Sequence, residues 1–240
     1  MANLLIDIGN KVLKAVWADG ITLGKIYRYQ GEKNTRFILD MLEQERPSKV
    51  VVSSSYVLDK AFLNMIEKNC DNLTVIDPQR NTLNEEMKLP AHLGADRVAA
   101  VTASRFLFKG KKCCIYDFGT MITMDSLDAS GNYVEGFISP GFISRLRSIN
   151  RYSRNLPLVM AVDTELEEGT LEYSIKEGVE SGIMFEIQGR MAENPDCIAV
   201  FTGGDSIYFA KRIKNSIFVA CNLVLMGLAL IAGRNEQNKF

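Results

Sequence analysis

Two short motifs place an aspartate beside a glycine where an apolar segment ends, a combination suited to binding phosphate and a metal ion. Residues 7–10 read Asp-Ile-Gly-Asn, and residues 117–120 read Asp-Phe-Gly-Thr. Glycine allows phosphate oxygens to approach the backbone amides closely, and the carboxylate can hold Mg²⁺, its waters or a monovalent cation. One such motif is typical of an ordinary tight turn. Two copies at equivalent places in the chain favour a site for a polyphosphate and its metal.

Two further features would add to such a site. Gly203 and Gly204 follow an apolar segment, where they would let a flat ring or a ribose approach the backbone. The alternative for these glycines is a plain strand-to-helix turn with Asp205 or Ser206 as the helix cap. Lys14 lies on the predicted strand after the first motif, where it could neutralise a γ-phosphate or remain a solvated strand lysine.

The stretch Gly94-Ala95-Asp96-Arg97 begins a predicted helix and offers two charged groups for different partners. Asp96 could accept a proton from a hydroxyl group, and Arg97 could bind a carboxylate through two hydrogen bonds. The alternative for Asp96 is a favourable charge at a helix N-terminus, worth about 0.5 kcal/mol. The same helix dipole disfavours an arginine in the first turn, so the pair favours a functional role.

The elements that must position these residues occur twice in the same order: three antiparallel strands, then alternating helices and strands. A repeat of half the chain indicates a duplicated domain, with a polar break near Gly110 and domains at 1–110 and 111–240. In the helix at 94–108 the buried stripe is predicted at Val98, Val101, Ala103 and Phe106. Strands are predicted at 3–8, 12–18, 21–29, 49–53, 73–76, 112–116, 121–127, 133–139, 198–202 and 217–220, and helices at 34–45, 59–69, 94–108, 142–152, 171–192, 206–213 and 222–232.

Composition narrows the class of protein. The chain has 240 residues, 47% hydrophobic and 24% charged, typical of a globular protein. A net charge of −1 argues against nucleic-acid binding as its main task. The single histidine, His92, excludes a metal site with several histidines, and five cysteines without a C-x-x-C motif indicate reduced core thiols. The first residues lack the basic start of a signal peptide, and the apolar run 223–232 is too short to span a bilayer. We therefore expect a cytoplasmic protein without nucleic-acid or membrane partners.

Taken in order, these motifs resemble the type III pantothenate kinase family, within the actin- and hexokinase-like ATPase superfamily. The resemblance covers essentially the whole chain and implies an α/β fold. It implies two similar RNase H-like halves, each a mixed sheet flanked by helices, with the active site in the cleft between them. The implied reaction is ATP-dependent phosphorylation of the primary hydroxyl of pantothenate, the first step of coenzyme A synthesis. The resemblance rests on the stretches 7–10, 93–97, 117–125, 133–141, 156–157, 169–182, 202–205 and 222–228.

The resemblance also implies roles for individual residues. The first motif and the strand after it would line the ATP phosphates, with Asp7 holding Mg²⁺ through water. Asp117 would hold a monovalent cation, K⁺ or NH₄⁺. Asp96 would be the proton acceptor, and Thr170 would complete the pantothenate site. Such kinases are homodimers with the substrate site close to the dimer interface. The residues implied for ATP are Asp7, Ile8, Gly9, Asn10, Lys11, Val12, Leu13, Lys14, Thr120, Gly203 and Gly204, and those implied for pantothenate are Gly94, Ala95, Asp96, Arg97 and Thr170.

Several positions depart from the family pattern and keep other hypotheses open. The retained carboxylates of Asp7, Asp96 and Asp117 favour an active pantothenate kinase. The departures are Lys11 for a threonine, Met121 for an alanine, Glu135 for a glycine, Met87 for a tyrosine near the substrate and Ser153 for a threonine. The first three are compatible with a non-catalytic paralogue that still binds nucleotide or pantothenate. The last two are compatible with a kinase for a related hydroxy acid. The apolar stretch 183–187 fits a dimer face or a buried core helix.

Overall fold

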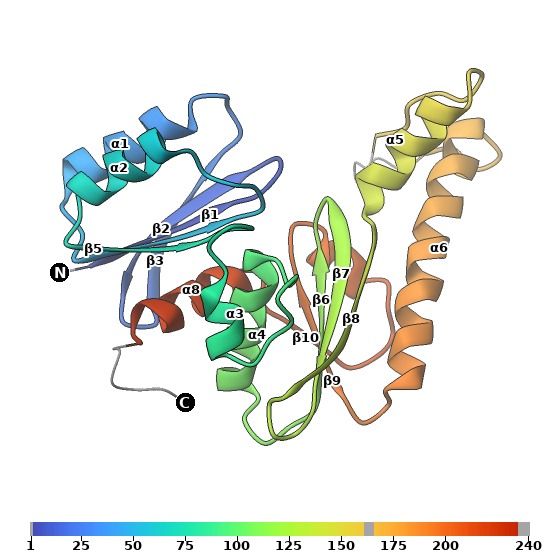
Figure 1. Ribbon diagram of the computed structural model, residues 1–240. Helices are drawn as coiled ribbons and strands as arrows, with labels where there is room; N and C mark the ends of the chain where they lie inside the picture. Colours follow the sequence, from blue (N-terminus) through green and yellow to red (C-terminus); the bar gives the residue numbers. More distant parts are fainter. Residues whose placement is uncertain (1, 161–165, 235–240) are drawn as a thin grey trace. The chain divides into compact units, whose positions relative to one another are not determined.

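The computed structural model describes residues 2–160 and 166–234 and contains two five-stranded mixed sheets with the same topology (Figure 1). The strand orders are β3-β2-β1-β4-β5 and β10-β9-β6-β7-β8. In each sheet the first three strands along the chain pair antiparallel, and the last two join in parallel. The strands are β1 (Asn3–Ile8), β2 (Leu13–Asp19), β3 (Thr22–Tyr29), β4 (Lys49–Ser54), β5 (Asn72–Ile76), β6 (Cys113–Phe118), β7 (Met121–Leu127), β8 (Tyr133–Pro140), β9 (Ile198–Thr202) and β10 (Ile217–Val219).

The helices connect the strands at the positions where the sequence requires crossovers between parallel neighbours. Helix α2 begins after Asp59, whose carboxylate accepts the Phe62 amide at 2.8 Å, and α6 begins after Thr170 in the same way. The helices are α1 (Asn34–Gln44), α2 (Lys60–Lys68), α3 (Thr82–Glu86), α4 (Ala95–Leu107), α5 (Phe142–Tyr152), α6 (Leu171–Glu193), α7 (Ser206–Ala210) and α8 (Leu223–Ala232).

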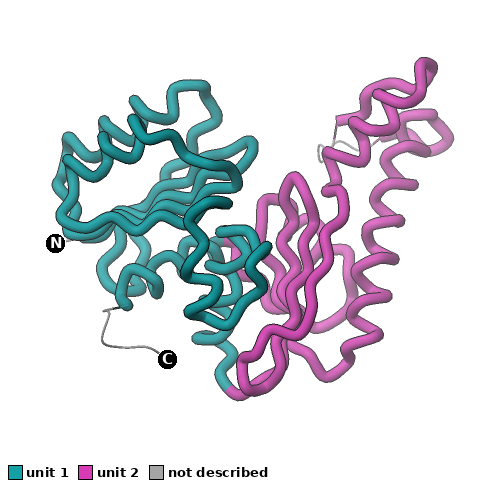
Figure 2. Tube along the Cα trace, in the orientation of Figure 1, with its two compact units in different colours: residues 1–109, 222–240 teal, residues 110–221 magenta. Residues whose placement is uncertain are grey.

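The chain divides into two compact units (Figure 2). Unit 1 holds the residues up to Lys109 and the described residues from Asn222 on, and unit 2 is Gly110–Cys221. The break near Gly110 lies at this boundary. The units differ from the sequence-based halves 1–110 and 111–240 because α8 packs against β1, β4 and α4 of unit 1.

In unit 1 the sheet is covered on both faces. Helices α1 and α2 lie over one face, where Leu4, Ile6 and Ile8 join their buried side chains in one core. Helices α4 and α8 cover the other face. They approach closely at Gly227, where an added Cβ would lie 2.8 Å from the Ala99 Cα. Close packing of these two helices fixes the position at which α4 begins.

In unit 2 the long helix α6 packs on α5 and on the sheet core. Its buried residues Ile175, Val179, Ile183 and Ile187 recur every fourth position, so they form one apolar stripe. Ile183 and Ile187 are therefore core residues, whereas Phe185 between them is 71% exposed. Within the apolar stretch 183–187, one side of α6 therefore packs in the core, and the ring of Phe185 is exposed on the other side.

The predicted elements are present with ends that shift by at most three residues, and four differences stand out. The first strand of unit 2 continues through Asp117 to Phe118, because the ladder to β7 and β9 continues past Tyr116. Helix α7 ends at Ala210, three residues before the predicted end. The prediction that Phe106 is buried is wrong: it lies in the last turn of α4 and is 52% exposed. The short helix α3 was not predicted.

No helix in the described part of the chain is both long enough and apolar enough to cross a bilayer.

Candidate active site

The first aspartate–glycine motif lies where β1 turns into β2. The Gly9 amide donates to the Val12 carbonyl at 3.1 Å, which closes a tight turn, and a Cβ on Gly9 would lie only 3.2 Å from that carbonyl. Asn10 and Lys11 are exposed in this turn, while Ile8 and Leu13 at its two ends are buried in the core. Ile8 and Leu13 thus anchor the turn and can offer a ligand only their backbone groups.

Asp7 lies just before this turn, buried between two neighbouring strands. Its direct partners in the strand register are Lys14 on β2 and Ser53 on β4. The Ser53 hydroxyl donates to Asp7 Oδ1 at 3.2 Å. Burial raises the pKa of Asp7 to about 6; the charge of Lys14 and the Ser53 hydrogen bond oppose the rise, and the charge of Asp96 adds to it. The lysine of the second strand therefore faces the buried carboxylate and is not an isolated surface charge.

Asp96 and Arg97 begin α4, after Gly94 at its N-cap position. Asp96 Oδ1 accepts the Arg97 amide at 2.8 Å, and Asp96 is only partly buried. Because the Asp96 charge acts on Asp7, the two carboxylates share one region of unit 1. Ala95 is buried beneath this helix start, and the Arg97 side chain is 7% exposed.

A buried side-chain amide, which the sequence analysis did not predict, positions the start of α4. Asn84, on α3, is 1% exposed and its Nδ2 donates to the Pro90 carbonyl at 2.9 Å and to the Leu93 carbonyl at 3.0 Å. Five residues of helix carry no apolar periodicity, so no pattern marked α3 in advance. Asn84 nevertheless fixes the segment that leads into Gly94 and Asp96.

Two residues of unit 1 that depart from the family pattern, Met87 and Lys11, have well-defined environments in the structure. Met87 is buried, and its sulfur accepts the Thr102 hydroxyl at 3.7 Å while its carbonyl accepts Arg105 Nη1 at 3.0 Å. A methionine at this position thus packs on α4, where a tyrosine would present a hydroxyl. Lys11 stays exposed within the turn.

In unit 2 the second motif and the paired glycines lie against each other. Gly203 has φ +92°, and a Cβ there would lie 2.6 Å from the Phe118 nitrogen and oxygen and closer still to the Asp117 carboxylate. The Asp205 amide donates to the Phe118 carbonyl at 3.1 Å. Glycine is therefore required at 203 both for its left-handed backbone and for the close approach. Asp117 and Gly203 belong to one site.

The turn after Asp117 also anchors the next helix. The Thr120 carbonyl accepts the Gly141 amide at 3.0 Å and the Ser144 hydroxyl at 2.6 Å, which fixes the start of α5. Met121 is 40% exposed beside this turn.

A pocket of about 270 Å³ opens beside the paired glycines in unit 2. Arg212 stacks its guanidinium 3.5 Å over the Tyr208 ring and pairs with Glu180 at 2.5 Å, so one wall is rigid. An aromatic and aliphatic wall beside glycine backbone suits a flat ring. The lining residues are Phe142, Gly204, Asp205, Ile207, Tyr208, Lys211 and Arg212.

Thr170 has a structural task. Its hydroxyl accepts the Tyr173 amide at 3.2 Å as the N-cap of α6 and donates to the Glu167 carbonyl at 2.7 Å. A ligand at Thr170 would have to share this hydroxyl with the helix cap.

The oxygen atoms that these residues offer to a metal fit a magnesium ion held by few protein ligands. Within residues 2–160 and 166–234, no three His, Cys, Asp or Glu side chains gather into a metal cluster. Mg²⁺ commonly keeps several waters and binds one or two carboxylates together with substrate phosphates. Asp7 is such a carboxylate, since it is buried with Ser53 as its hydrogen-bond donor. Asp117 likewise offers a single carboxylate, and it lies beside a turn with several backbone carbonyls.

Ser53 and Ser55 were also missed by the sequence reading. The sequence did contain a signal for them, because the apolar strand predicted at 49–53 leads into three consecutive serines at 53–55. The carboxyl ends of parallel strands meet at one edge of a sheet, where α/β proteins place ligand sites. The parallel pairing of β4 with β1 brings Ser53 to Asp7, and Ser55 to Ile8 and Asn10.

These elements define the chain as an α/β protein with the fold of the actin- and hexokinase-like ATPases. Among solved structures it is similar to the activator of the 2-hydroxyisocaproyl-CoA dehydratase from Clostridium difficile with bound ADPNP, with a TM-score of 0.56, 14% identity and coverage of 97% of this chain and 94% of that one. A family model, type III pantothenate kinase, matches residues 3–194. The chain belongs to this family, whose members are small-molecule kinases.

Relatives in this family are similar over the full length. A type III pantothenate kinase of Phocaeicola vulgatus is 33% identical, with 98% of this chain and 99% of the relative covered. One of Christiangramia forsetii is 34% identical over the same shares. The fold class and family expected from the motifs are confirmed. The roles of the individual site residues remain predictions.

Proposed function

We propose that this protein transfers the γ-phosphoryl group of ATP to the primary hydroxyl of pantothenate, which yields 4′-phosphopantothenate for coenzyme A synthesis. The observation that carries the proposal is the grouping of Asp7, Lys14 and Asp96 in unit 1 of a chain of this family. A buried carboxylate, a facing ammonium group and a second, more exposed carboxylate are the parts that phosphoryl transfer to an alcohol requires.

The roles are those that the resemblance to the family implies, and the burial and position of the residues are compatible with them. Asp96, the more exposed carboxylate, would take the hydroxyl proton as the hydroxyl oxygen bonds to the γ-phosphorus and the bond from phosphorus to the β,γ-bridging oxygen breaks. Asp7 would hold Mg²⁺ through water, and Lys14 would face the phosphates from the neighbouring strand. Mg²⁺, when bound, supplies positive charge to the β- and γ-phosphates. Gly94, Ala95, Arg97 and Thr170 would contribute to the pantothenate site.

Unit 2 would supply the remaining contacts to ATP. The pocket beside Gly204 would take the nucleoside, because exposed Ile207 and the stacked pair of Arg212 and Tyr208 line it next to exposed glycine backbone. Asp117 would hold K⁺ or NH₄⁺, and Thr120 would contact the nucleotide from the same turn.

We also propose that the protein is a homodimer that works in the cytoplasm. The edge strand β8 pairs with β7 alone among the described strands, and it exposes Val134 by 61% and Ile138 by 59%. Arg190 of α6 lies 3.9 Å over the Phe137 ring, so α6 flanks the same strand. A long apolar edge requires cover, and a second copy supplies one. A protein that sediments as a monomer, both as the wild type and as the Ile138→Lys variant, would contradict the proposed homodimer.

The test of function is a phosphoryl-transfer assay with purified protein, ATP, Mg²⁺ and pantothenate, in K⁺ and in Na⁺. We expect K⁺-dependent formation of phosphopantothenate. Asp96→Asn should lower turnover by about two to four orders of magnitude with ATP binding retained. An unchanged rate would remove Asp96 as the proton acceptor.

Two specific observations favour alternatives that the same assay separates. Lys11 occupies the turn between β1 and β2 in place of a threonine, so a folded protein that binds pantothenate without turnover would be a non-catalytic paralogue. Lys11→Thr should then restore activity. Met87 packs on α4 and presents no hydroxyl, so turnover on another hydroxy acid in preference to pantothenate would assign a different substrate.

A further inference from the structure

We propose that Ser53 and Ser55, at the end of β4, are positioning residues that hold the phosphate turn 7–10 in its nucleotide-binding geometry. The inference rests on the proposed function, in which this turn binds ATP and Mg²⁺. Neither serine needs to touch the substrate, since each acts through the turn.

Ser53 acts on the carboxylate. It is 1% exposed and its hydroxyl donates to Asp7 Oδ1, across the parallel pair of β1 and β4. A buried serine commonly satisfies its hydroxyl with a nearby backbone carbonyl, as Ser54 does with the Tyr56 carbonyl at 2.7 Å. Ser53 instead holds one carboxylate oxygen, which leaves the orientation of Asp7 fixed before any cation arrives.

Ser55 acts on the turn itself. Its amide donates to the Ile8 carbonyl at 3.2 Å, so the segment after β4 continues alongside the end of β1. Its hydroxyl lies 3.3 Å from Asn10 Oδ1 and 3.4 Å from the Ile8 carbonyl. Ser55 thus contacts the turn on both sides of Gly9.

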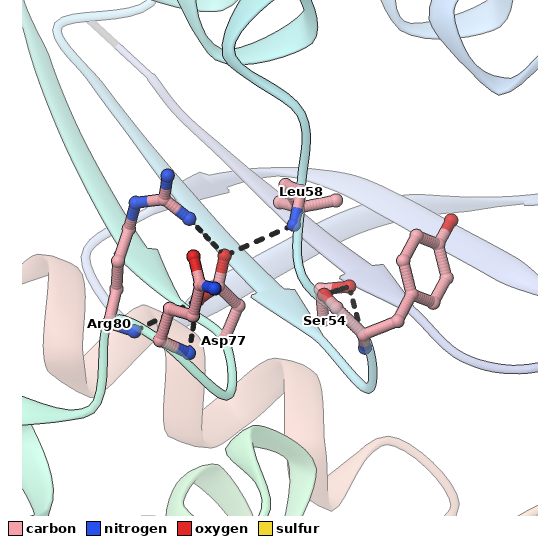
Figure 3. A network of polar contacts seen from close by, with 6 residues as sticks. Ser54, Leu58, Asp77 and Arg80 are labelled. Carbon is pink, nitrogen blue, oxygen red and sulfur yellow. Dashed lines mark hydrogen bonds and ion pairs between the residues drawn. The ribbon is translucent and has the colours of Figure 1, made fainter.

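The segment that carries these serines is anchored at its far end, so it can resist movement of the turn. The Leu58 amide donates to Asp77 Oδ2 at 3.2 Å (Figure 3). Asp77 is 2% exposed and also accepts the Gln79 and Arg80 amides, each at 2.9 Å, and pairs with the Arg80 guanidinium. Ser54 closes the bend between these points through Tyr56. The phosphate turn is therefore braced against the buried network at the end of β5.

The test compares Ser53→Ala and Ser55→Ala with Ser48→Ala in the full-length protein. Ser48 is a matched control because its hydroxyl, just before β4, also bonds a residue of β1, at 3.1 Å from Asn3 Oδ1, but at the opposite end of these two strands. Calorimetric titration with Mg²⁺ and a non-hydrolysable ATP analogue measures nucleotide binding without turnover. Steady-state kinetics then separate the KM for Mg·ATP from the KM for pantothenate.

We expect Ser53→Ala and Ser55→Ala each to weaken binding of the Mg²⁺–nucleotide analogue by about tenfold. They should raise the KM for Mg·ATP and leave the KM for pantothenate near the wild-type value. Ser53→Thr keeps the hydroxyl and should restore binding, which separates loss of the bond from loss of folding. Ser48→Ala should bind as the wild type does.

Equal nucleotide affinity in Ser53→Ala, Ser55→Ala and Ser48→Ala would overturn the inference. So would a parallel rise in the KM for pantothenate, which would indicate general loosening of unit 1. A wild type that binds the Mg²⁺–nucleotide analogue, and loses affinity in Ser53→Ala, but forms no phosphopantothenate would support the positioning role and refute the proposed function. A wild type with no affinity for the analogue would refute both.

Discussion

Replacing Asp7 by asparagine should stabilise the nucleotide-free protein at neutral pH. The same replacement should abolish the binding of Mg·ATP. Burial raises the pKa of Asp7 from 3.8 to about 6, with Lys14, Asp96 and Ser53 modifying the rise. Because a tenfold change in proton affinity corresponds to about 1.4 kcal/mol, holding this carboxylate ionised in the fold costs about 3 kcal/mol above pH 7. The attraction of Lys14 is already contained in that net value.

The sign of the pH dependence follows from the raised pKa. The folded state binds the proton more tightly than the unfolded state, so stability from this group is fully present below the unfolded pKa of 3.8 and is lost as pH rises through about 6. Asparagine resembles the protonated acid and cannot ionise, so it avoids the loss. The stability gain of Asp7→Asn should therefore grow from less than about 1 kcal/mol at pH 4 to about 3 kcal/mol at pH 7.5.

The assay is urea unfolding followed by the fluorescence of Trp17, the single tryptophan, which lies on β2 in the same unit as Asp7. Asp71→Asn is the control, because Asp71 is an exposed partner of Arg46 in unit 1 and should give a small, nearly pH-independent change. Mg·ATP should raise the unfolding midpoint of the wild type and leave that of Asp7→Asn unchanged. A variant no more stable than the wild type at pH 7.5, or a difference that does not vary with pH, would refute the reasoning.

Three further changes follow from packing. Gly227→Ala forces a Cβ into Ala99 and should lower stability by about 1–3 kcal/mol, measured by urea unfolding. Ser104→Ala removes a buried hydroxyl that has no hydrogen-bond partner among the described residues, and it should be neutral or stabilising by up to about 1 kcal/mol in the same measurement; a clear loss would contradict this. Gly203→Ala, at φ +92°, drives a Cβ toward Asp117 and should abolish any activation by K⁺, whereas retained activation would place the cation elsewhere.

Features set by neighbours along the chain could be predicted from the sequence. The two aspartate–glycine turns, the strands around them and the start of α4 follow from apolar runs, glycines and caps. The pairing of Lys14 with Asp7 is of the same kind, because a tight turn between two strands fixes their register.

Features set by distant contacts could not be predicted. Asp96 reaches the region of Asp7 because α4 packs beneath the sheet with α8, and no local pattern records that packing. Ser53 becomes important only once β4 lies parallel to β1. Five residues of α3 are too few for periodicity, although Asn84 on that helix positions the start of α4.

The return of α8 to unit 1 has a consequence for how the protein is made. Unit 2 is continuous in sequence, so all of its strands have been synthesised once Cys221 has been added. Unit 1 is completed only when residues 223–232 follow, because α8 covers β1 and β4 and supports α4. During synthesis the earlier part of unit 1 must therefore wait for α8 before Asp96 is held in place. Because synthesis is vectorial, Asp96 is therefore held in place only after all of unit 2 has been made.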